Sequence, residues 1–434
     1  MLQNMKVSYY SLGCKVNLYE SEAIINQFLD HGFELANFND QCDVYIINTC
    51  SVTAVSDSKS RKIIRQAIRK NPNAVVAVMG CYAQLKPDDI KNIDGVDVIV
   101  GTSNRHLLYP LVIESLQSKN QKVLVDDILN VKNYEEIKIK RFNNKTRGFI
   151  KIQDGCDNYC SYCTIPYARG HIRSRKPDDV IAEIQELSNQ GVAEIVLTGI
   201  NTASYGRDLK GYDFADLLGE IVNKVVNLGR IRISSIEVTE ISDKLLAIIK
   251  ENQNIFCNHF HIPLQSGNDN TLKSMYRKYD TTYYKDKITK IRNLFPDVNI
   301  TTDVLVGFPG ETEEDFNSTY NFIKSIEFGE MHVFPYSRRP MTKAYNLPNQ
   351  VDEVTKHYRV NKLLQLNEEL ALKYRHKFLN KYVWVVVEEV RNGLARGHSD
   401  NYLNVEVKAN LNANDLVKVL ITDVGYPICK GVLK

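Results

Sequence analysis

Three of the chain's nine cysteines lie close together in the stretch GCDNYCSYC. Cys156, Cys160 and Cys163 are separated by gaps of three and two residues and follow the strand-like run GFIKIQ. A tetrahedral zinc site wants a fourth protein ligand, whereas three thiolates on an iron–sulfur cube leave one iron free to bind another group. No suitably spaced Cys or His pair lies close downstream. The spacing therefore favours an open iron–sulfur cluster, with a zinc site as the alternative.

Three further cysteines occupy equivalent places in a repeated pattern. Cys14, Cys50 and Cys81 each follow a strand-like run, in SLGC, INTC and MGC, and are spaced 36 and 31 residues apart, about one βα unit each. The carboxyl ends of neighbouring parallel strands share one edge of a sheet, where ligands usually bind. We expect these thiols to converge as a second metal centre, although each one alone would be read as a buried structural cysteine.

The remaining cysteines and two histidines have more ordinary interpretations. Cys42, Cys257 and Cys429 lie beside or within apolar strand-like segments without companions at ligand spacing, so we interpret them as structural. An odd number of cysteines also argues against a disulfide framework. His259 and His261 flank Phe260 in a strand and face the same side of it. They could bind a metal, although hydrogen-bonded core histidines are more common.

The elements that must position these residues fall into three regions. Residues 6–118 alternate strands and helices, with helices near 18–30 and 54–69, which predicts an open α/β domain with a parallel sheet. A polar stretch near 132–147 precedes further strands within 193–201, 231–238, 258–267 and 299–312, separated by helical stretches. In the last of these, Gly307 and Gly310 predict a tight turn before a helix that begins near Thr312.

The C-terminal region changes character after a helix predicted over 353–380. Short alternating strands with Gly, Asn and Asp turns predict a small all-β barrel. Its side chains Arg391, Arg396, His398 and Tyr402 suit phosphate contacts and a stacking surface for RNA, or are solvated loop residues.

Composition limits the classes that remain. A chain of 434 residues with 43% hydrophobic and 25% charged content is long enough for two or three globular domains. No apolar run approaches the roughly 18 to 20 residues that span a bilayer, and the N-terminus does not resemble a secretory signal. We expect a cytoplasmic protein with no membrane segment. Net charge is only +3, but basic runs at 59–70, 138–147 and 169–176 permit a polyanionic partner; each run alone also fits a solvated face.

The three-cysteine motif carries a family resemblance. C-x3-C-x2-C with the aromatic Tyr162 before its last cysteine resembles the signature of radical S-adenosylmethionine (SAM) enzymes. The resemblance implies a partial (βα)6 barrel with SAM across the carboxyl ends of its strands. It would place Tyr162 near the adenine of SAM. The other implied contacts are Thr198, Gly199 and Asn201 near the methionine moiety, with Glu237 and Gln265 elsewhere along the cofactor or substrate.

The order of the parts extends the resemblance to nearly the whole chain. Strand-end cysteines, a C-x3-C-x2-C barrel and a TRAM-like β-barrel are typical of methylthiotransferases. SLGCKVNLYESE and GCDNYCSYCTIPYARGHIRSR most resemble the MtaB-type branch, which acts on N6-threonylcarbamoyladenosine in tRNA. The branch that modifies ribosomal protein S12 typically has proline where this chain has Lys15, and a third branch modifies isopentenyladenosine. The implied domains are 1–118 for an auxiliary cluster, 142–372 for radical SAM chemistry and 376–434 for RNA binding.

This resemblance also implies cofactors, partners and a product. Each three-cysteine set would hold a 4Fe-4S cluster, and SAM would serve as radical source and methyl donor. The product would be the 2-methylthio derivative at position 37 of tRNA. The partners would be a tRNA anticodon loop and an electron donor such as a flavodoxin or ferredoxin. The competing interpretations are a zinc-containing RNA-binding protein and a radical enzyme that uses its extra cluster for electron transfer.

Overall fold

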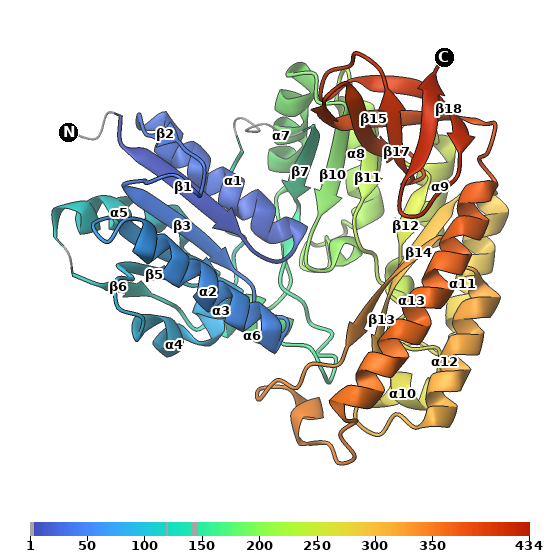
Figure 1. Cartoon of the computed structure of the whole chain (residues 1–434), viewed down its shortest axis with the longest axis horizontal. Helices are drawn as coiled ribbons and strands as arrows, with labels where there is room; N and C mark the ends of the chain where they lie inside the picture. The colour runs from blue at the N-terminus through green and yellow to red at the C-terminus, as the bar shows by residue number, and fades with distance from the viewer. Residues whose placement is uncertain (1–3, 119, 140–145) are drawn as a thin grey trace.

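The computed structural model describes residues 4–118, 120–139 and 146–434 and contains the three predicted regions in order (Figure 1). Residues 140–145, with most of the basic run at 138–147 and the expected domain start at 142, lie outside the described residues. Among the helices of the described part, none combines the length and apolar character that a bilayer crossing requires.

The N-terminal region is an open parallel sheet, as predicted. Six strands pair in the order β2-β1-β3-β4-β5-β6, all in parallel. Every residue of β3 and β4 is buried, as expected for central strands covered by helices on both faces. The strands are β1 (Lys6–Ser11), β2 (Glu34–Leu35), β3 (Val44–Thr49), β4 (Val75–Gly80), β5 (Val98–Val100) and β6 (Lys122–Leu124). The sheet thus continues past residue 118 to β6.

Helices flank this sheet and begin where the strand-end cysteines stand. The first helix begins at Lys15, three residues before the predicted start, and Cys14 is its N-cap residue, without a side-chain cap bond. The second begins as predicted at Ala54, capped by the Thr53 side chain. The helices are α1 (Lys15–Asp30), α2 (Ala54–Lys70), α3 (Cys81–Leu85), α4 (Pro87–Lys91) and α5 (Leu108–Gln117), with short 3-10 turns η1 (Arg105–Leu107) and η2 (Ile128–Asn130).

The middle region is the predicted partial βα barrel. Two parallel three-stranded sheets, β11-β10-β7 and β12-β13-β14, are joined by bridges between Ile231 and Phe256 and between Ser235 and His261. The strands are β7 (Arg147–Lys151), β10 (Glu194–Thr198), β11 (Arg230–Ile233), β12 (His259–His261), β13 (Asn299–Val306) and β14 (Glu330–Pro335). No pairing joins β7 to β14 within the described residues, so the barrel is open on one side.

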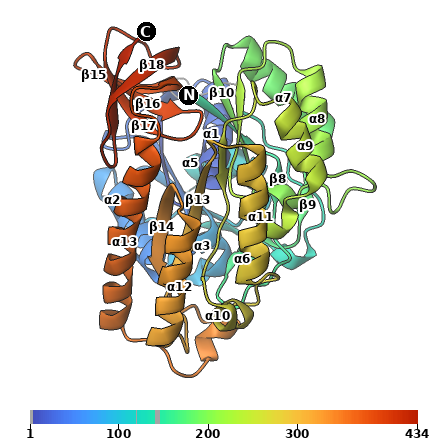
Figure 2. The same ribbon diagram turned by 90° about the vertical axis from the view of Figure 1, so that its right-hand side faces the viewer.

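Helices cover the outside of this barrel (Figures 1 and 2). They are α7 (Pro177–Asn189), α8 (Phe214–Lys224), α9 (Asp243–Glu251), α10 (Asp269–Ser274), α11 (Thr281–Leu294), α12 (Glu313–Ile326) and α13 (Glu353–His376), whereas the short α6 (Ile165–Arg169) lies against α3 of the sheet domain. The remaining short elements are β8 (Gln153–Asp154), β9 (Arg173–Ser174), η3 (Thr202–Ser204), η4 (Val238–Glu240) and η5 (Lys343–Asn346). Thr312 caps α12, and Gly307 and Gly310 both have positive φ, which confirms the predicted turn and helix start.

The C-terminal region closes into a five-stranded barrel in the order β15-β16-β17-β19-β18. Its strands are β15 (Tyr382–Arg391), β16 (Leu394–Ser399), β17 (Asn404–Lys408), β18 (Leu416–Asp423) and β19 (Cys429–Leu433). Tyr374 at the end of α13, together with Phe378, packs into its core, so this small barrel is attached to the βα barrel. The prediction of a small all-β barrel is confirmed.

Candidate functional site

The loop after β8 carries Cys156, Cys160 and Cys163. Gly155 precedes it with a φ of +75°, and a Cβ at this position would lie 1.8 Å from the carbonyl oxygen of His171, so only glycine fits. The backbone N–H of Cys156 donates to Gly170 O at 3.0 Å, and Ile165 N donates to Cys163 Sγ at 3.4 Å. Burial, and then the nearby Cys160 and Cys156, raise the pKa of the Cys163 thiol. The three thiols therefore lie close enough to interact electrostatically.

A buried arginine contacts this first set. Arg277 Nη1 lies 3.2 Å from Cys160 Sγ, and the same guanidinium forms an ion pair with Glu237. Arg277 is therefore held by a carboxylate while it donates to a sulfur. No motif in the sequence pointed to Arg277, which is 117 residues from Cys160 in the chain.

The second set converges from three separate strand ends. Cys14 caps α1, Cys50 follows β3 directly, and Cys81 opens α3 directly after β4. Gly13 has a φ of +99°, and a Cβ here would lie 2.9 Å from Cys50 Cβ and 3.0 Å from Cys50 Sγ. The absence of a side chain at Gly13 lets the first and second strand ends approach. Cys50 and Cys14 both interact electrostatically with Cys81, so the structure brings the three thiols together.

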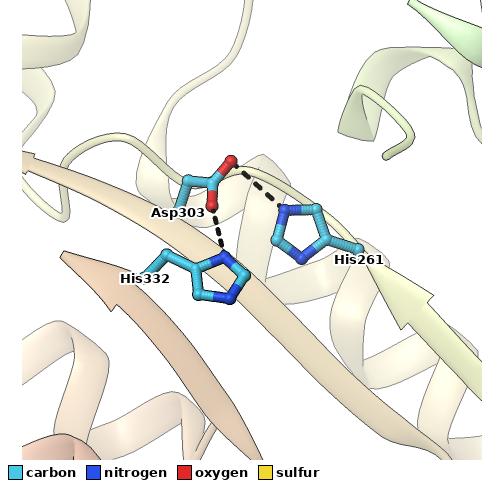
Figure 3. A group of neighbouring side chains, drawn as sticks. All are labelled: His261, Asp303 and His332. Atoms are coloured by element: carbon cyan, nitrogen blue, oxygen red, sulfur yellow. Dashed lines mark hydrogen bonds and ion pairs between the residues drawn. The ribbon is translucent and has the colours of Figure 1, made fainter. Parts of the chain in front are cut away.

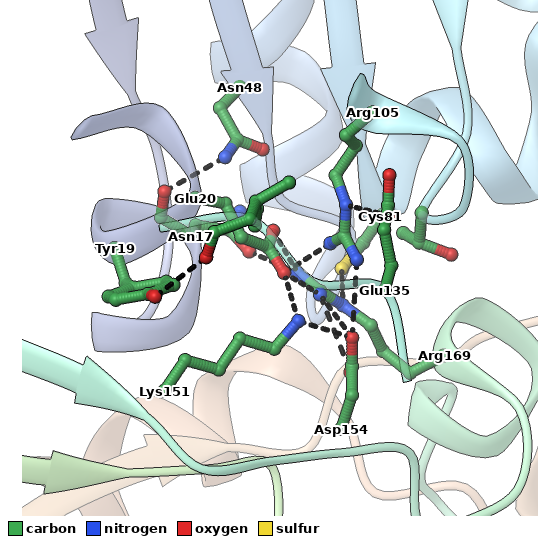
Figure 4. A network of polar contacts seen from close by, with 12 residues as sticks. Asn17, Tyr19, Glu20, Asn48, Cys81, Arg105, Glu135, Lys151, Asp154 and Arg169 are labelled. Atoms are coloured by element: carbon green, nitrogen blue, oxygen red, sulfur yellow. Dashed lines mark hydrogen bonds and ion pairs between the residues drawn. The ribbon is translucent and has the colours of Figure 1, made fainter. Parts of the chain in front are cut away.

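A buried arginine also contacts this second set. Arg169 Nε donates to Cys81 Sγ at 3.3 Å, and Arg169 Nη2 donates to Asn17 Oδ1 at 2.5 Å. Burial raises the pKa of Cys81 to about 12, against the opposing effect of the Arg169 charge. Because Arg169 belongs to α6, the βα barrel supplies a contact to the sheet domain's cysteines (Figure 4).

A buried charge network holds the two domains together around Arg169 (Figure 4). Glu20 of α1 forms ion pairs with Arg105, Lys151 and Arg169. Burial disfavours the Glu20 carboxylate, but these three cations outweigh it and lower its pKa to about 2. Asp154 pairs with Lys151 at 2.5 Å on the barrel side. The network therefore fixes the sheet domain against the barrel region next to Cys81, which Arg169 contacts.

One of the basic runs, at 169–176, does not form an arginine-rich surface. The sequence allowed the run at 169–176 to contact a polyanion or to form a solvated face, but its three arginines, Arg169, Arg173 and Arg175, are all buried. Arg175 pairs with Glu136 and Glu183. These guanidiniums are committed to internal carboxylates and cannot contact phosphates. In the run at 59–70, by contrast, charges on α2 remain exposed; the exposed members are Lys59, Lys62, Arg65 and Arg69.

A cavity of about 480 Å³ lies between the sheet domain and the interior of the βα barrel. Residues 13–16, including Cys14, form its wall on one side, and Thr198 and Gly199 belong to the barrel side. Thr301, Asp303 and His332 contribute from further along the barrel strands. One cysteine of the second set and two expected SAM contacts therefore face the same space.

The expected SAM contacts have features that suit a polar ligand. Asn201 Nδ2 and Glu237 Oε1 are buried without a hydrogen-bond partner among the described residues. Buried polar atoms rarely lack a hydrogen-bond partner, so these two atoms are suited to bind polar groups of a ligand. A Cβ on Gly199 would lie 2.9 Å from Gln153 Oε1, so a side chain here would require the Gln153 side chain to move.

The remaining two expected contacts lie at the edges of this region. Tyr162 is partly buried and packs against a small apolar cluster that includes Phe308 and Tyr336. Gln265 has a φ of +66° and bridges to Val304 of β13. Both stay predictions as SAM contacts, and the unpartnered atoms of Asn201 and Glu237 show that the residues present fit such a cofactor.

The two predicted histidines face the same side of their strand. His259 and His261 each lie 2.9 Å from Thr301 Oγ1 through one ring nitrogen. Asp303 accepts from His261 through Oδ2 at 3.2 Å and from His332 through Oδ1 at 3.1 Å (Figure 3). The hydrogen bond and charge of Asp303 raise the pKa of His332, despite partial burial. Both oxygens of this carboxylate are thus engaged inside the cavity.

Tyr402 does not offer the stacking surface that the sequence suggested. Its ring stacks on His259 at 4.5 Å and on His398 at 4.6 Å between centroids, so both faces are covered. His398 also pairs with Glu388. Arg391 and Arg396 are exposed, each paired with a glutamate of the same barrel. Tyr402 therefore joins the small barrel to the βα barrel, and contacts of both arginines with phosphate stay a prediction.

The structural cysteines are as expected. Cys42, Cys257 and Cys429 are buried, and all nine cysteines are free thiols.

Family models match the same cysteine-bearing regions. Residues 150–323 match the Radical SAM superfamily, and residues 6–101 match a family described as uncharacterized protein family UPF0004. A solved structure, the radical S-adenosylmethionine methyltransferase TsrM from Kitasatospora setae, shares the fold with a TM-score of 0.58 at 14% identity. The match covers 79% of this chain and 77% of the TsrM chain.

Two relatives match most of the chain in sequence. The threonylcarbamoyladenosine tRNA methylthiotransferase MtaB of Bacillus subtilis is 44% identical over 431 residues, covering 98% of this chain and 95% of the relative. The tRNA-2-methylthio-N(6)-dimethylallyladenosine synthase of Thermoanaerobacter pseudethanolicus is 36% identical over 396 residues, covering 89% of this chain and 83% of the relative.

Proposed function

The chain belongs to the radical S-adenosylmethionine methylthiotransferases that modify tRNA, and we propose that it methylthiolates C2 of N6-threonylcarbamoyladenosine at position 37. The observation that carries the proposal is the shared cavity, which Cys14 lines from the sheet domain and Thr198 and Gly199 line from the barrel. The choice of base is supported by the threonylcarbamoyladenosine-specific relative, which has the higher identity and coverage of the two.

Two 4Fe-4S clusters are part of the proposal. The radical SAM family uses SAM with one such cluster, and we assign it to Cys156, Cys160 and Cys163. Cys14, Cys50 and Cys81 would hold the second. When bound, the first cluster with SAM supplies a 5'-deoxyadenosyl radical and the second supplies the sulfur that is methylated and transferred.

The chain's own residues position and shield these groups. Asn201 and Glu237 would donate to and accept from polar groups of SAM through their unpartnered atoms. Arg277 and Arg169 would each donate to one cluster sulfur. The buried network around Glu20 would hold the two domains together, because Glu20 of the sheet domain pairs with Lys151 and Arg169 of the barrel region.

The tRNA would enter through its anticodon loop, because a loop base can be unstacked and inserted into a pocket. The exposed basic face of α2 would contact phosphates. A small electron-transfer protein such as a flavodoxin or ferredoxin would supply the electron that SAM cleavage consumes.

Anaerobic turnover on two defined tRNAs tests the substrate. The loaded enzyme is given SAM, a reductant and tRNA that carries either threonylcarbamoyladenosine or dimethylallyladenosine, and the nucleosides are analysed by mass. We expect the 2-methylthio derivative of threonylcarbamoyladenosine to dominate. Product on the dimethylallyl tRNA alone would assign the chain to the other activity. If the enzyme carries both clusters and forms no product on either tRNA, the proposal that tRNA is its substrate is wrong.

A further inference from the structure

The cavity between the two domains contains several charged groups, and its carboxylates already have partners. Asp303 is paired with His261 and His332, as described above. Glu330, the other lining carboxylate, pairs with Arg375 at 2.9 Å. The negative charge of the cavity wall is therefore balanced within the protein.

The two arginines that interact electrostatically with Lys15 of the cavity wall, Arg147 and Arg232, are also paired with carboxylates. Arg232 pairs with Glu194 at 2.8 Å and donates to carbonyl oxygens of the small barrel. Arg147 lies between Glu194 and Glu388. These guanidiniums bind internal carboxylates and are not available to a ligand.

Lys15 also lines the cavity and differs from the paired charged residues described above. It is the first residue of α1, directly after Cys14, and its side chain is half-buried in the cavity wall. No hydrogen bond or ion pair of its ammonium group is found with any residue in the described ranges. Asp303 lies close enough to interact with it electrostatically, but the two oxygens of Asp303 are held by the histidines. Among the described residues that line the cavity, Lys15 is therefore a cation without a direct partner.

We propose that the Lys15 ammonium binds the carboxylate of the threonylcarbamoyl group and thereby selects this substituted adenosine. This inference rests on the proposed function, because it names the group that distinguishes the two candidate bases. The threonylcarbamoyl substituent carries one carboxylate at neutral pH, whereas the dimethylallyl substituent is apolar and uncharged.

The position of Lys15 fits this role. Lys15 follows Cys14 in the chain, so the two residues reach the same cavity from adjacent backbone positions. A base with C2 directed at the Cys14 side would carry its N6 substituent into the space lined by Lys15, Thr301 and His332. A carboxylate enclosed there without a cation would be left unpaired, which is costly in a partly buried site. Recognition would thus favour the acid and reject its neutral analogues.

Binding of two anticodon stem-loops tests the proposal without turnover. One stem-loop carries threonylcarbamoyladenosine, and the other carries the same nucleoside with its carboxylate converted to the carboxamide. Dissociation constants are measured for the cluster-loaded enzyme without reductant. We expect the wild-type enzyme to bind the acid at least about tenfold more tightly than the carboxamide, because a charge-assisted contact is lost.

Substitutions of Lys15 then assign the preference to this side chain. Lys15→Met should bind both stem-loops equally, whereas Lys15→Arg should keep most of the preference for the acid. Lys285→Met, on the exposed face of α11, is the matched control and should keep the full preference. Because the acid is compared with the carboxamide within each variant, a general loss of affinity cancels.

Two results would overturn the role of Lys15: equal binding of both stem-loops by the wild-type enzyme, or an undiminished preference in Lys15→Met. Neither result would affect the proposed function if threonylcarbamoyladenosine tRNA is still converted. Failure of the proposed function would appear separately, as product formed on the dimethylallyl tRNA alone.

Discussion

Arg169 and Cys81 come from different domains, and Arg169 Nε lies 3.3 Å from Cys81 Sγ. The other cysteine set has a similar contact, between Arg277 Nη1 and Cys160 Sγ at 3.2 Å. Each set of thiols is therefore supported by one buried guanidinium that is itself held by a carboxylate, Glu20 for Arg169 and Glu237 for Arg277.

Replacing Arg277 should alter one cluster and leave the other unchanged. Hydrogen bonds to ligand sulfurs are among the factors that set cluster potentials, and they favour the reduced, more negative form. Arg277→Gln should lower the midpoint potential of the cluster on Cys156, Cys160 and Cys163. A redox titration followed by electron paramagnetic resonance measures this shift, with the second cluster as internal control. Unchanged potentials for both clusters would show that the contact has no electrostatic role.

The buried carboxylate of Glu20 should be essential for stability. Glu20→Gln leaves Arg105, Lys151 and Arg169 without their shared anion, and breaking a buried ion pair costs about 3–5 kcal/mol. Chemical denaturation of the variant and the parent measures this loss. The control is Glu220→Gln, which removes an exposed helical pair with Lys224 and should cost less than about 1 kcal/mol.

The lowered pKa of Glu20 predicts that the stability of the protein depends on pH. The pKa of Glu20 is lowered to about 2 in the folded protein from an ordinary value of 4.5. Its contribution to stability is therefore fully present above pH 4.5 and is lost as the pH falls toward 2. The difference in unfolding free energy between the parent and Glu20→Gln should shrink over that range. A constant difference would contradict the role of these charges.

Substituting one cysteine of each set should impair a different step of the reaction. Cys160→Ala should abolish reductive cleavage of SAM, whereas Cys50→Ala should retain some cleavage without sulfur insertion. Iron content should fall from about eight atoms per chain to about four in each variant. SAM cleavage products and methylthio nucleoside are measured together. Full sulfur insertion by Cys50→Ala would disprove the assignment of the second cluster, and Cys42→Ala serves as a control for a structural cysteine.

His332 should titrate above its ordinary range because of Asp303. Its pKa is raised mainly by the hydrogen bond from His332 to Asp303, so the stability it contributes is present below pH 6.5 and is lost as the pH rises through the folded-state value. NMR of labelled histidine should show this raised pKa in the parent and a lower value in Asp303→Asn. An identical pKa in both proteins would contradict the pairing seen in Figure 3.

The exposed basic face of α2 should govern the salt dependence of tRNA binding. Replacing Lys62, Arg65 and Arg69 with glutamine removes up to three phosphate contacts. The slope of log affinity against log salt concentration should become shallower by about 2 to 3. A matched triple on the outer barrel helices, Lys273, Lys285 and Lys324 to glutamine, should leave the slope unchanged. Equal effects of both triples would remove α2 from the interface.

Local patterns in the sequence were sufficient to predict the main helices and strands and the two sets of three cysteines. The periodicity of residues 6–118 determined a parallel sheet, and its topology implied that Cys14, Cys50 and Cys81 would converge at strand ends. The C-x3-C-x2-C spacing is confined to one loop. Such features depend on neighbouring residues or on the general rules of parallel sheets, so they can be derived without coordinates.

Only the tertiary structure decided how distant polar residues are used. The arginines of the run at 169–176 were taken for surface charge, but they are buried against carboxylates of other elements. For Tyr402 the sequence left open a stacking surface for RNA or a solvated loop position, but its ring stacks on the imidazoles of His259 and His398. Arg169 contacts Cys81 across 88 residues of chain, and Lys15 lies beside carboxylates that are already paired. Whether a charged side chain is paired, buried or available depends on which distant segment packs against it, and the local pattern around that residue does not contain this information.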